Sequence, residues 1–157
     1  MAEPNIAFDK TELRNVYKAF KVLGDEAKAE ARQQSNALAE FLQGEIRQAG
    51  YQRTSGASAV QRIVNGSRVT KSSTTGEITY GFSSQRFSGG ATTKTLWAGY
   101  EFGSSIYKQF PRWSGRQGRG SRGWFIYPTL RKNQNYIVRE WSAAFNRILD
   151  KWGINGI

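Results

Sequence analysis

Residues 96–130 read LWAGYEFGSSIYKQFPRWSGRQGRGSRGWFIYPTL and surround a centre rich in glycine and arginine with large aromatic rings. A surface loop has no need of so many rings, so we expect another surface to bury them. Glycines at 115, 118, 120 and 123 keep the centre from holding helix or strand alone. The ends should be ordered: residues 96–102 predict either a strand or a short helix, and residues 124–127 form an apolar run before Pro128. The rings are Trp97, Tyr100, Phe102, Tyr107, Phe110, Trp113, Trp124, Phe125 and Tyr127.

A C-terminal helix is predicted for residues 128–153. Pro128 suits the first helical turn, where its missing amide hydrogen costs nothing, and Gly153 ends the pattern. Apolar residues then recur at helical spacing on one face, which predicts a plain core contact. They are Ile137, Trp141, Ala144, Phe145, Ile148 and Trp152.

The N-terminal third predicts a loose arm over residues 1–8, followed by helix over residues 9–50. Asp9 and Glu12 have the spacing of a capping box, and Gly50 is the predicted stop. Apolar residues recur every three or four positions between them. One straight helix of this length would span roughly 60 Å at ~1.5 Å per residue. We therefore expect a break near Gly24 and Asp25.

The middle of this helical stripe is rich in alanine, with Ala27, Ala29, Ala31, Ala37 and Ala39. Small residues let another element come close, which fits a helix lying on its own sheet or a contact with a neighbouring subunit. The following region, residues 57–102, predicts strands at 60–64, 68–72 and 77–83, with a turn at 73–76. In the last of these strands, Ile78, Tyr80 and Phe82 alternate with smaller residues, as expected for a sheet with one buried face.

Together these elements predict a single α+β domain, since 157 residues suffice for one core. It would contain a long, broken N-terminal helix, an antiparallel sheet of three to five strands and a C-terminal helix. Both helices would pack against one face of the sheet. Residues 103–123 would project as an extended loop, and a loop of that length is usually functional or disordered.

Composition narrows the function classes. The chain has no cysteine and no histidine, so disulfides, thiolate metal sites and Ser-His or Cys-His catalysis are excluded. The four acids beyond residue 50 are Glu77, Glu101, Glu140 and Asp150, and they fall on different predicted elements. We therefore expect no enzyme, no metal and no cofactor.

No stretch approaches the ~20 apolar residues of a membrane span, and residues 1–10 lack a secretory signal pattern, so we expect synthesis in the cytosol and no membrane partner.

The net charge of +11 is unevenly distributed. Residues 1–50 carry seven Lys/Arg against eight Asp/Glu, and residues 51–157 carry sixteen against four. Such an excess favours a polyanion or an acidic protein face as partner. Within the loop, cations interleaved with rings fit three interpretations: a contact between subunits, a contact with DNA backbone, or a solvated segment. The candidate DNA-facing residues are Lys108, Arg112, Arg116, Arg119 and Arg122.

The same region carries a family resemblance. Residues 97–103 read Trp-Ala-Gly-Tyr-Glu-Phe-Gly; a basic aromatic loop follows, and then Phe-Ile-Tyr-Pro at 125–128 leads into the terminal helix. This order resembles the tail-completion or head-tail joining proteins of long-tailed double-stranded DNA bacteriophages. Those proteins tend to have a Thr-Gly step after the first long helix, and Thr54, Ser55 and Gly56 are similar to it with one residue inserted.

The resemblance implies a structural virion protein of the phage neck, made in the host cytoplasm. It would form a ring of six copies that joins tail to head, lets DNA pass and contacts neighbouring neck and tail proteins. If residues 96–102 are packed, Glu101 needs a cationic or amide partner, and we favour an arginine of the loop or of a neighbouring subunit; the alternative is an exposed acid at a strand edge. The alternative function is a basic double-stranded-DNA-binding module without catalytic activity. The candidate assembly residues are Glu101, Phe102, Gly103, Tyr107, Phe110, Pro111, Trp113, Trp124 and Phe125.

Overall fold

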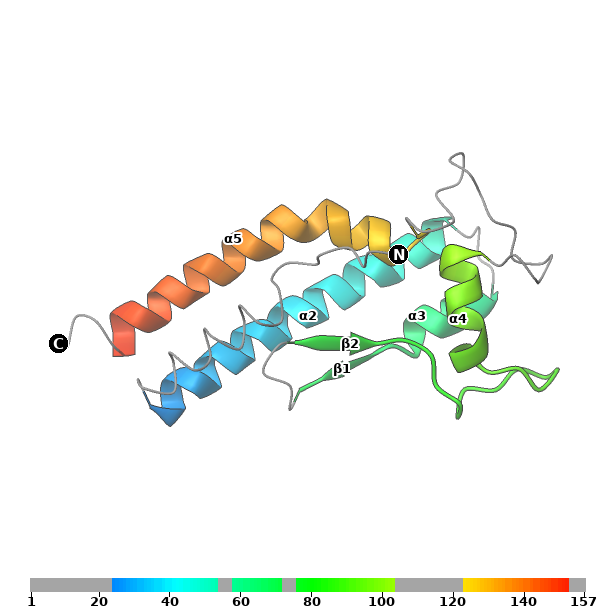
Figure 1. The fold of residues 1–157 in the computed structure, drawn as a ribbon, viewed down its shortest axis with the longest axis horizontal. Helices are drawn as coiled ribbons and strands as arrows, with labels where there is room; N and C mark the ends of the chain where they lie inside the picture. Colours follow the sequence, from blue (N-terminus) through cyan, green and yellow to red (C-terminus); the bar gives the residue numbers. More distant parts are fainter. Residues whose placement is uncertain (1–23, 54–57, 72–75, 104–122, 153–157) are drawn as a thin grey trace. The chain divides into compact units, whose positions relative to one another are not determined.

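A computed structural model of this chain describes residues 24–53, 58–71, 76–103 and 123–152. These residues are mostly helical, with a small antiparallel sheet of two strands (Figure 1). They therefore fit an α+β class. The expected N-terminal arm, the helix before Gly24 and residues 104–122 of the loop lie outside the described residues. The elements are α2 (Asp25–Arg53), α3 (Ser58–Asn65), β1 (Arg68–Thr70), β2 (Glu77–Thr79), α4 (Thr93–Phe102) and α5 (Tyr127–Trp152).

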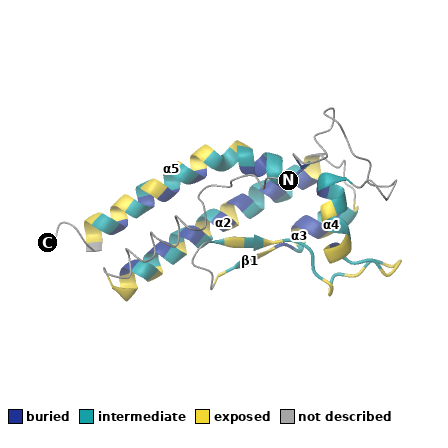
Figure 2. Ribbon diagram, in the orientation of Figure 1, coloured by how far each residue is buried: buried dark blue, intermediate teal, exposed yellow. Residues whose placement is uncertain are grey.

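The chain divides into two compact units, each assembled from separate segments. Among the described residues, unit 1 takes 42–53, 58–68, 78–103 and 123–132, and unit 2 takes 24–41, 69–71, 76–77 and 133–152. Helices α2 and α5 contribute to both units. Buried positions recur along both helices (Figure 2).

The core of unit 2 is a contact between two helices. Ala27 and Ala31 of α2 are buried against Trp141 and Ile148 of α5. The absence of larger side chains on α2 admits the indole of Trp141, whose burial is worth roughly 2–3 kcal/mol. The predicted helix at 128–153 is confirmed by α5. The expectation that these alanines lie on a sheet is wrong at Ala27 and Ala31, because they face α5.

The start of β2 meets α2 in the same unit. Gly76 has φ +65°, and a Cβ there would lie 2.6 Å from the Ser35 carbonyl oxygen. The Asn36 side chain donates to the Lys71 carbonyl at 3.0 Å, and Lys71 pairs with Glu40 at 2.8 Å. The end of the strand pair is therefore anchored to α2 by backbone proximity and polar contacts.

Unit 1 packs α3 against the C-terminal half of α2. Val60, Ile63 and Val64 are buried at spacings of three and four. The predicted strand at 60–64 is therefore wrong, because valine and isoleucine favour strands but here form one face of a helix. The strand at 68–72 is confirmed as β1 at 68–70, and the strand at 77–83 shortens to β2. Of the predicted three to five strands, the described residues form two.

Gly50 does not end α2, which continues to Arg53. The residue is buried, and a Cβ there would lie 2.9 Å from Val64 Cγ1. Glycine at this position therefore serves the close approach of α3.

The substitution Gly50→Ala is expected to lower the free energy of unfolding by about 1–3 kcal/mol, because the added methyl group collides with Val64. Gly44→Ala is the matched control, since a Cβ at Gly44 meets nothing within 4 Å. It should raise stability by up to about 1 kcal/mol through helix propensity. Denaturant unfolding of both variants measures the difference; a Gly50→Ala variant that also gains stability would disprove the close contact.

Candidate functional site: a buried carboxylate at the base of the basic segment

The carboxylate of Glu101 lies inside unit 1 and is 0% exposed. It sits one residue before the end of α4, whose start is fixed by a capping box between Thr92 and Thr95. The prediction for residues 96–102 left helix and strand open, and the structure decides for helix. Gly103 ends α4 with φ +78°, and its amide donates to the Gly99 carbonyl at 2.8 Å.

Glu101 accepts hydrogen bonds from three consecutive backbone amides directly before α5. The Trp124 amide donates to Oε1 at 2.5 Å, the Phe125 amide to Oε1 at 2.9 Å, and the Ile126 amide to Oε2 at 2.8 Å. Amides at the start of a helix have no partner within that helix and carry partial positive charge. The carboxylate therefore supplies from α4 the acceptor that the beginning of α5 needs.

Glycine at position 123 makes room for this arrangement. Gly123 has φ +80°, and a Cβ there would lie 2.6 Å from Glu101 Oε1 and 3.0 Å from the Tyr127 Cβ. A side chain would thus meet the carboxylate as well as backbone strain. We call Glu101, Gly103, Gly123 and the amides of residues 124–126 the loop-base clamp.

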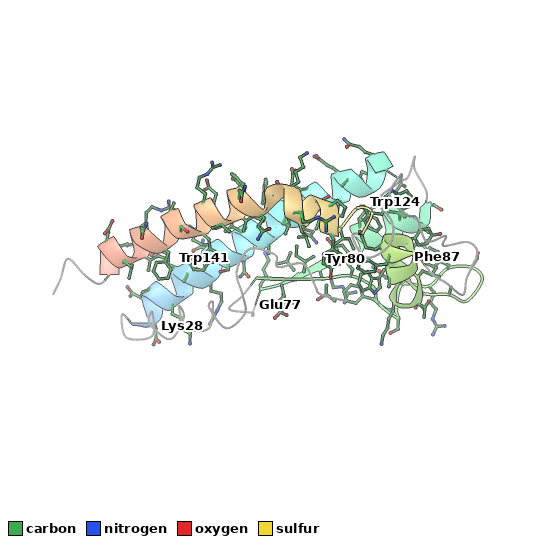
Figure 3. The ribbon with its side chains drawn as sticks, turned by 45° about the horizontal axis from the view of Figure 1, so that its top comes forward. Lys28, Glu77, Tyr80, Phe87, Trp124 and Trp141 are labelled. Carbon is green, nitrogen blue, oxygen red and sulfur yellow. The ribbon has the colours of Figure 1, made fainter. Side chains whose placement is uncertain are left out.

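Apolar side chains close the loop-base clamp off from water. Phe125 and Ile126 are buried, and the Thr129 hydroxyl donates to the Phe125 carbonyl at 2.7 Å. The ring of Phe102 lies 5.2 Å from the ring of Tyr127, between centroids. Trp124, which Figure 3 labels, is half-buried and lies three residues before the start of α5.

Burial raises the pKa of Glu101 to about 7, an effect that the hydrogen bonds from the backbone amides oppose without cancelling. Burial also raises the pKa of the nearby Tyr80 hydroxyl; the Glu101 charge adds to this effect, and Arg47 opposes it. The Tyr80 hydroxyl is buried and has no hydrogen-bond partner within the described part of the chain. The carboxylate thus lies in a sparsely solvated interior, where each amide bond counts more than it would in water.

The clamp joins the two ends of the predicted loop. Glu101 lies two residues before Gly103, and its amide partners begin directly after Gly123. Gly103 and Gly123, the two ends of the predicted loop, are therefore held at one base. The amide alternative for the partner of Glu101 is what the structure shows; the favoured arginines lie in the undescribed segment or in a second chain.

The predicted assembly residues separate into two groups in the described region. Glu101 and Phe125 are both 0% exposed within unit 1 and belong to the contact that holds the base in place, and their role in assembly stays a prediction. Phe102, Gly103 and Trp124 are half-buried beside them. The remaining residues fall in the undescribed segment. They are Tyr107, Lys108, Phe110, Pro111, Arg112, Trp113, Arg116, Arg119 and Arg122.

Sequence reasoning missed the role of Thr92, Thr93 and Thr95. The Thr93 hydroxyl is buried, donates to Gln85 Oε1 at 2.7 Å and accepts from the Phe82 amide at 2.8 Å. The available signal was the Thr-x-x-Thr spacing of residues 92–95, a weaker variant of the usual capping box. It would have favoured helix over strand for the residues that follow.

Within the described ranges, no group of three or more acidic side chains could hold a metal ion. None of the described helices is both long enough and apolar enough to cross a membrane.

Comparison of the chain with protein-family models, with curated proteins and with solved structures found no match.

Proposed function

We propose that this chain is a structural virion protein of the neck of a long-tailed double-stranded DNA phage. It assembles as a ring of six copies that joins tail to head and lets DNA pass. Its mechanism is recognition of neighbouring subunits and of neighbouring neck and tail proteins, without catalysis and without a cofactor. This function follows from the resemblance, and the loop-base clamp is the observation that supports it best.

The clamp gives a physical reason for the Glu-Phe-Gly step on which the resemblance rests. Glu101 accepts hydrogen bonds from the amides directly before α5, and Phe102 packs on Tyr127. Gly103 adopts the positive φ that ends α4. All three residues therefore serve to fix one base. A fixed base favours a contact role, because holding the ends of a segment removes part of the entropy lost when it docks on a partner.

The segment between Gly103 and Gly123 carries the residues suited to such a contact. Tyr107, Phe110, Pro111 and Trp113 lie among arginines, and aromatic residues and arginine are enriched at protein interfaces. Docking of the segment on a neighbouring subunit would bury its rings at the moment of assembly. We therefore place the principal subunit contact in residues 104–122, beside the half-buried Phe102, Gly103 and Trp124.

The double substitution Phe110→Ala with Trp113→Ala tests this proposal. We expect the melting temperature of the monomer to change little, while ring formation, measured by light scattering and electron microscopy, is lost. The matched control is Phe41→Ala with Tyr136→Ala, which removes two exposed rings of unit 2 whose centroids lie 4.9 Å apart. This control should still assemble. A Phe110/Trp113 variant that unfolds as a monomer would place these rings in the core, and one that assembles normally would remove them from the interface.

The second candidate function is a basic double-stranded-DNA-binding module, favoured by the charge of the chain. Lys108, Arg112, Arg116, Arg119 and Arg122 would then contact phosphates, and affinity would fall steeply with salt. Binding that persists at physiological salt in a protein that never forms a ring would favour this function over the neck protein.

A further inference from the structure

Positive charge is concentrated in unit 1, even without the undescribed loop. Among side chains that the structure describes, unit 1 carries seven Lys/Arg, whereas its acids are Glu45 and the buried Glu101. Unit 2 carries six Lys/Arg against seven Asp/Glu, counted in the same way. The cations of unit 1 are Arg47, Arg62, Arg68, Arg86, Lys94, Arg131 and Lys132.

Two exposed arginines of unit 1 are held on aromatic rings. The guanidinium carbon of Arg68 lies 3.9 Å from the centroid of Phe82, and that of Arg62 lies 4.9 Å from the centroid of Phe87. Arg62 also donates to the Arg86 carbonyl oxygen at 2.5 Å. A guanidinium stacked on a ring keeps donors at its edge and loses little rotamer entropy when it binds an oxyanion.

The two rings, Phe82 and Phe87, belong to the turn after β2, whose backbone is held by hydrogen bonds. The Phe87 amide donates to the Ala91 carbonyl at 2.7 Å, and the Thr93 hydroxyl accepts from the Phe82 amide at 2.8 Å. Arg86 forms an isolated antiparallel bridge with Thr92. Figure 3 labels Phe87, which lies beside α4. The two rings over which Arg62 and Arg68 lie are thus positioned by hydrogen-bonded backbone.

We propose that Arg62, Arg68, Arg86 and Lys94, here called the arginine surface, bind the phosphate backbone of double-stranded DNA. All four side chains are exposed, and they come from α3, β1, the turn after β2 and the start of α4. A DNA duplex offers phosphates at regular spacing to several such cations at once. These four residues are different from the candidate loop cations, and the proposal does not depend on ring assembly.

The test uses the full-length protein and a fluorescein-labelled duplex, with anisotropy measured across a series of salt concentrations. The double variant Arg62→Gln with Arg68→Gln should weaken binding about tenfold and reduce the salt slope by roughly 1–2, because each phosphate contact contributes ~0.9. The control Arg139→Gln with Arg147→Gln removes two exposed arginines of unit 2, one of which lies over the Tyr136 ring. Its affinity and slope should remain close to those of the unchanged protein.

Arg62 donates to a backbone carbonyl, so its substitution could also disturb the fold. The variant Arg86→Gln with Lys94→Gln therefore provides an independent pair. Thermal unfolding verifies that each variant is folded. Unlabelled duplex should compete, whereas polyglutamate and inorganic phosphate at equal ionic strength should not. The proposal is overturned if the duplex does not bind, or if the unit 2 control loses as much affinity as the two surface variants. Competition by polyglutamate as strong as by duplex would instead assign the surface to an acidic protein.

Discussion

The substitution Glu101→Ala is expected to lower the free energy of unfolding by roughly 3–5 kcal/mol, because it leaves buried amides without an acceptor. The side chain is 0% exposed and accepts from the amides of Trp124, Phe125 and Ile126. Phe125 and Ile126 are buried, so water reaches their amides only if the start of α5 separates from α4. Urea unfolding of the two proteins measures the loss.

Two further variants separate the carboxylate from general effects of substitution. Glu101→Gln keeps the volume and one acceptor oxygen but turns an NH₂ group toward donors, so an intermediate loss of about 1–3 kcal/mol is expected. Glu45→Ala removes a half-buried acid of α2 in the same unit and should change stability by no more than about 0.5 kcal/mol. A Glu101→Ala variant as stable as Glu45→Ala would mean that the amides have another acceptor.

The second large effect is expected at Gly123. Alanine there takes a positive φ, which costs roughly 1–2 kcal/mol, and its Cβ would lie 2.6 Å from the Glu101 carboxylate, which adds about 1–3 kcal/mol. Gly90→Ala is the matched control, because Gly90 has φ +89° and a Cβ there meets nothing within 4 Å. It should lose the strain term alone.

Denaturant unfolding of Gly123→Ala, Gly90→Ala and the unchanged protein measures the cost of the positive φ and the cost of the collision with Glu101. Equal losses at the two glycines would show that the carboxylate does not occupy the space beside Gly123. Gly123→Ala should also be measured in the Glu101→Ala background. If its loss of stability there falls to that of Gly90→Ala, the two substitutions are non-additive, which demonstrates the collision directly.

The long helices could be predicted from the sequence because their apolar residues recur over many turns. In α5, Ile137, Trp141, Ala144 and Ile148 are buried as their spacing predicts. α2 starts at Asp25, after Gly24 with φ +110°, where the sequence predicts a break, and the helix predicted before Gly24 lies outside the described residues. Periodicity over several turns outweighs the preferences of single residues.

Short elements could not be predicted in the same way. Val60, Ile63 and Val64 fit a buried strand as well as one face of a two-turn helix, and only packing against α2 decides between them. Gly50 was the predicted stop of α2, yet its role is to admit Val64, a contact from another segment. Such roles depend on tertiary neighbours that local sequence does not reveal.

The candidate site was predictable in part. A carboxylate between Tyr100 and Phe102 had to find a partner once buried, and cations and amides were the two choices. Because arginine is abundant nearby, a salt bridge was the favoured choice. In the described structure the amides before α5 are the partners instead, and they donate to Glu101. Residues 124–126 looked like a plain apolar run because sequence letters show side chains and conceal the hydrogen-bond donors of the backbone.

Amide hydrogen exchange at Trp124, Phe125 and Ile126 tests most directly whether Glu101 holds the start of α5 to the end of α4. In the unchanged protein these three amides should exchange slowly, and in Glu101→Ala they should exchange at least about a hundredfold faster, since a loss of 1.4 kcal/mol is tenfold and more than twice that is expected. Amides of α5 in unit 2, such as that of Trp141, should change much less. Fast exchange of all three in the unchanged protein, or slow exchange in Glu101→Ala, would contradict the clamp.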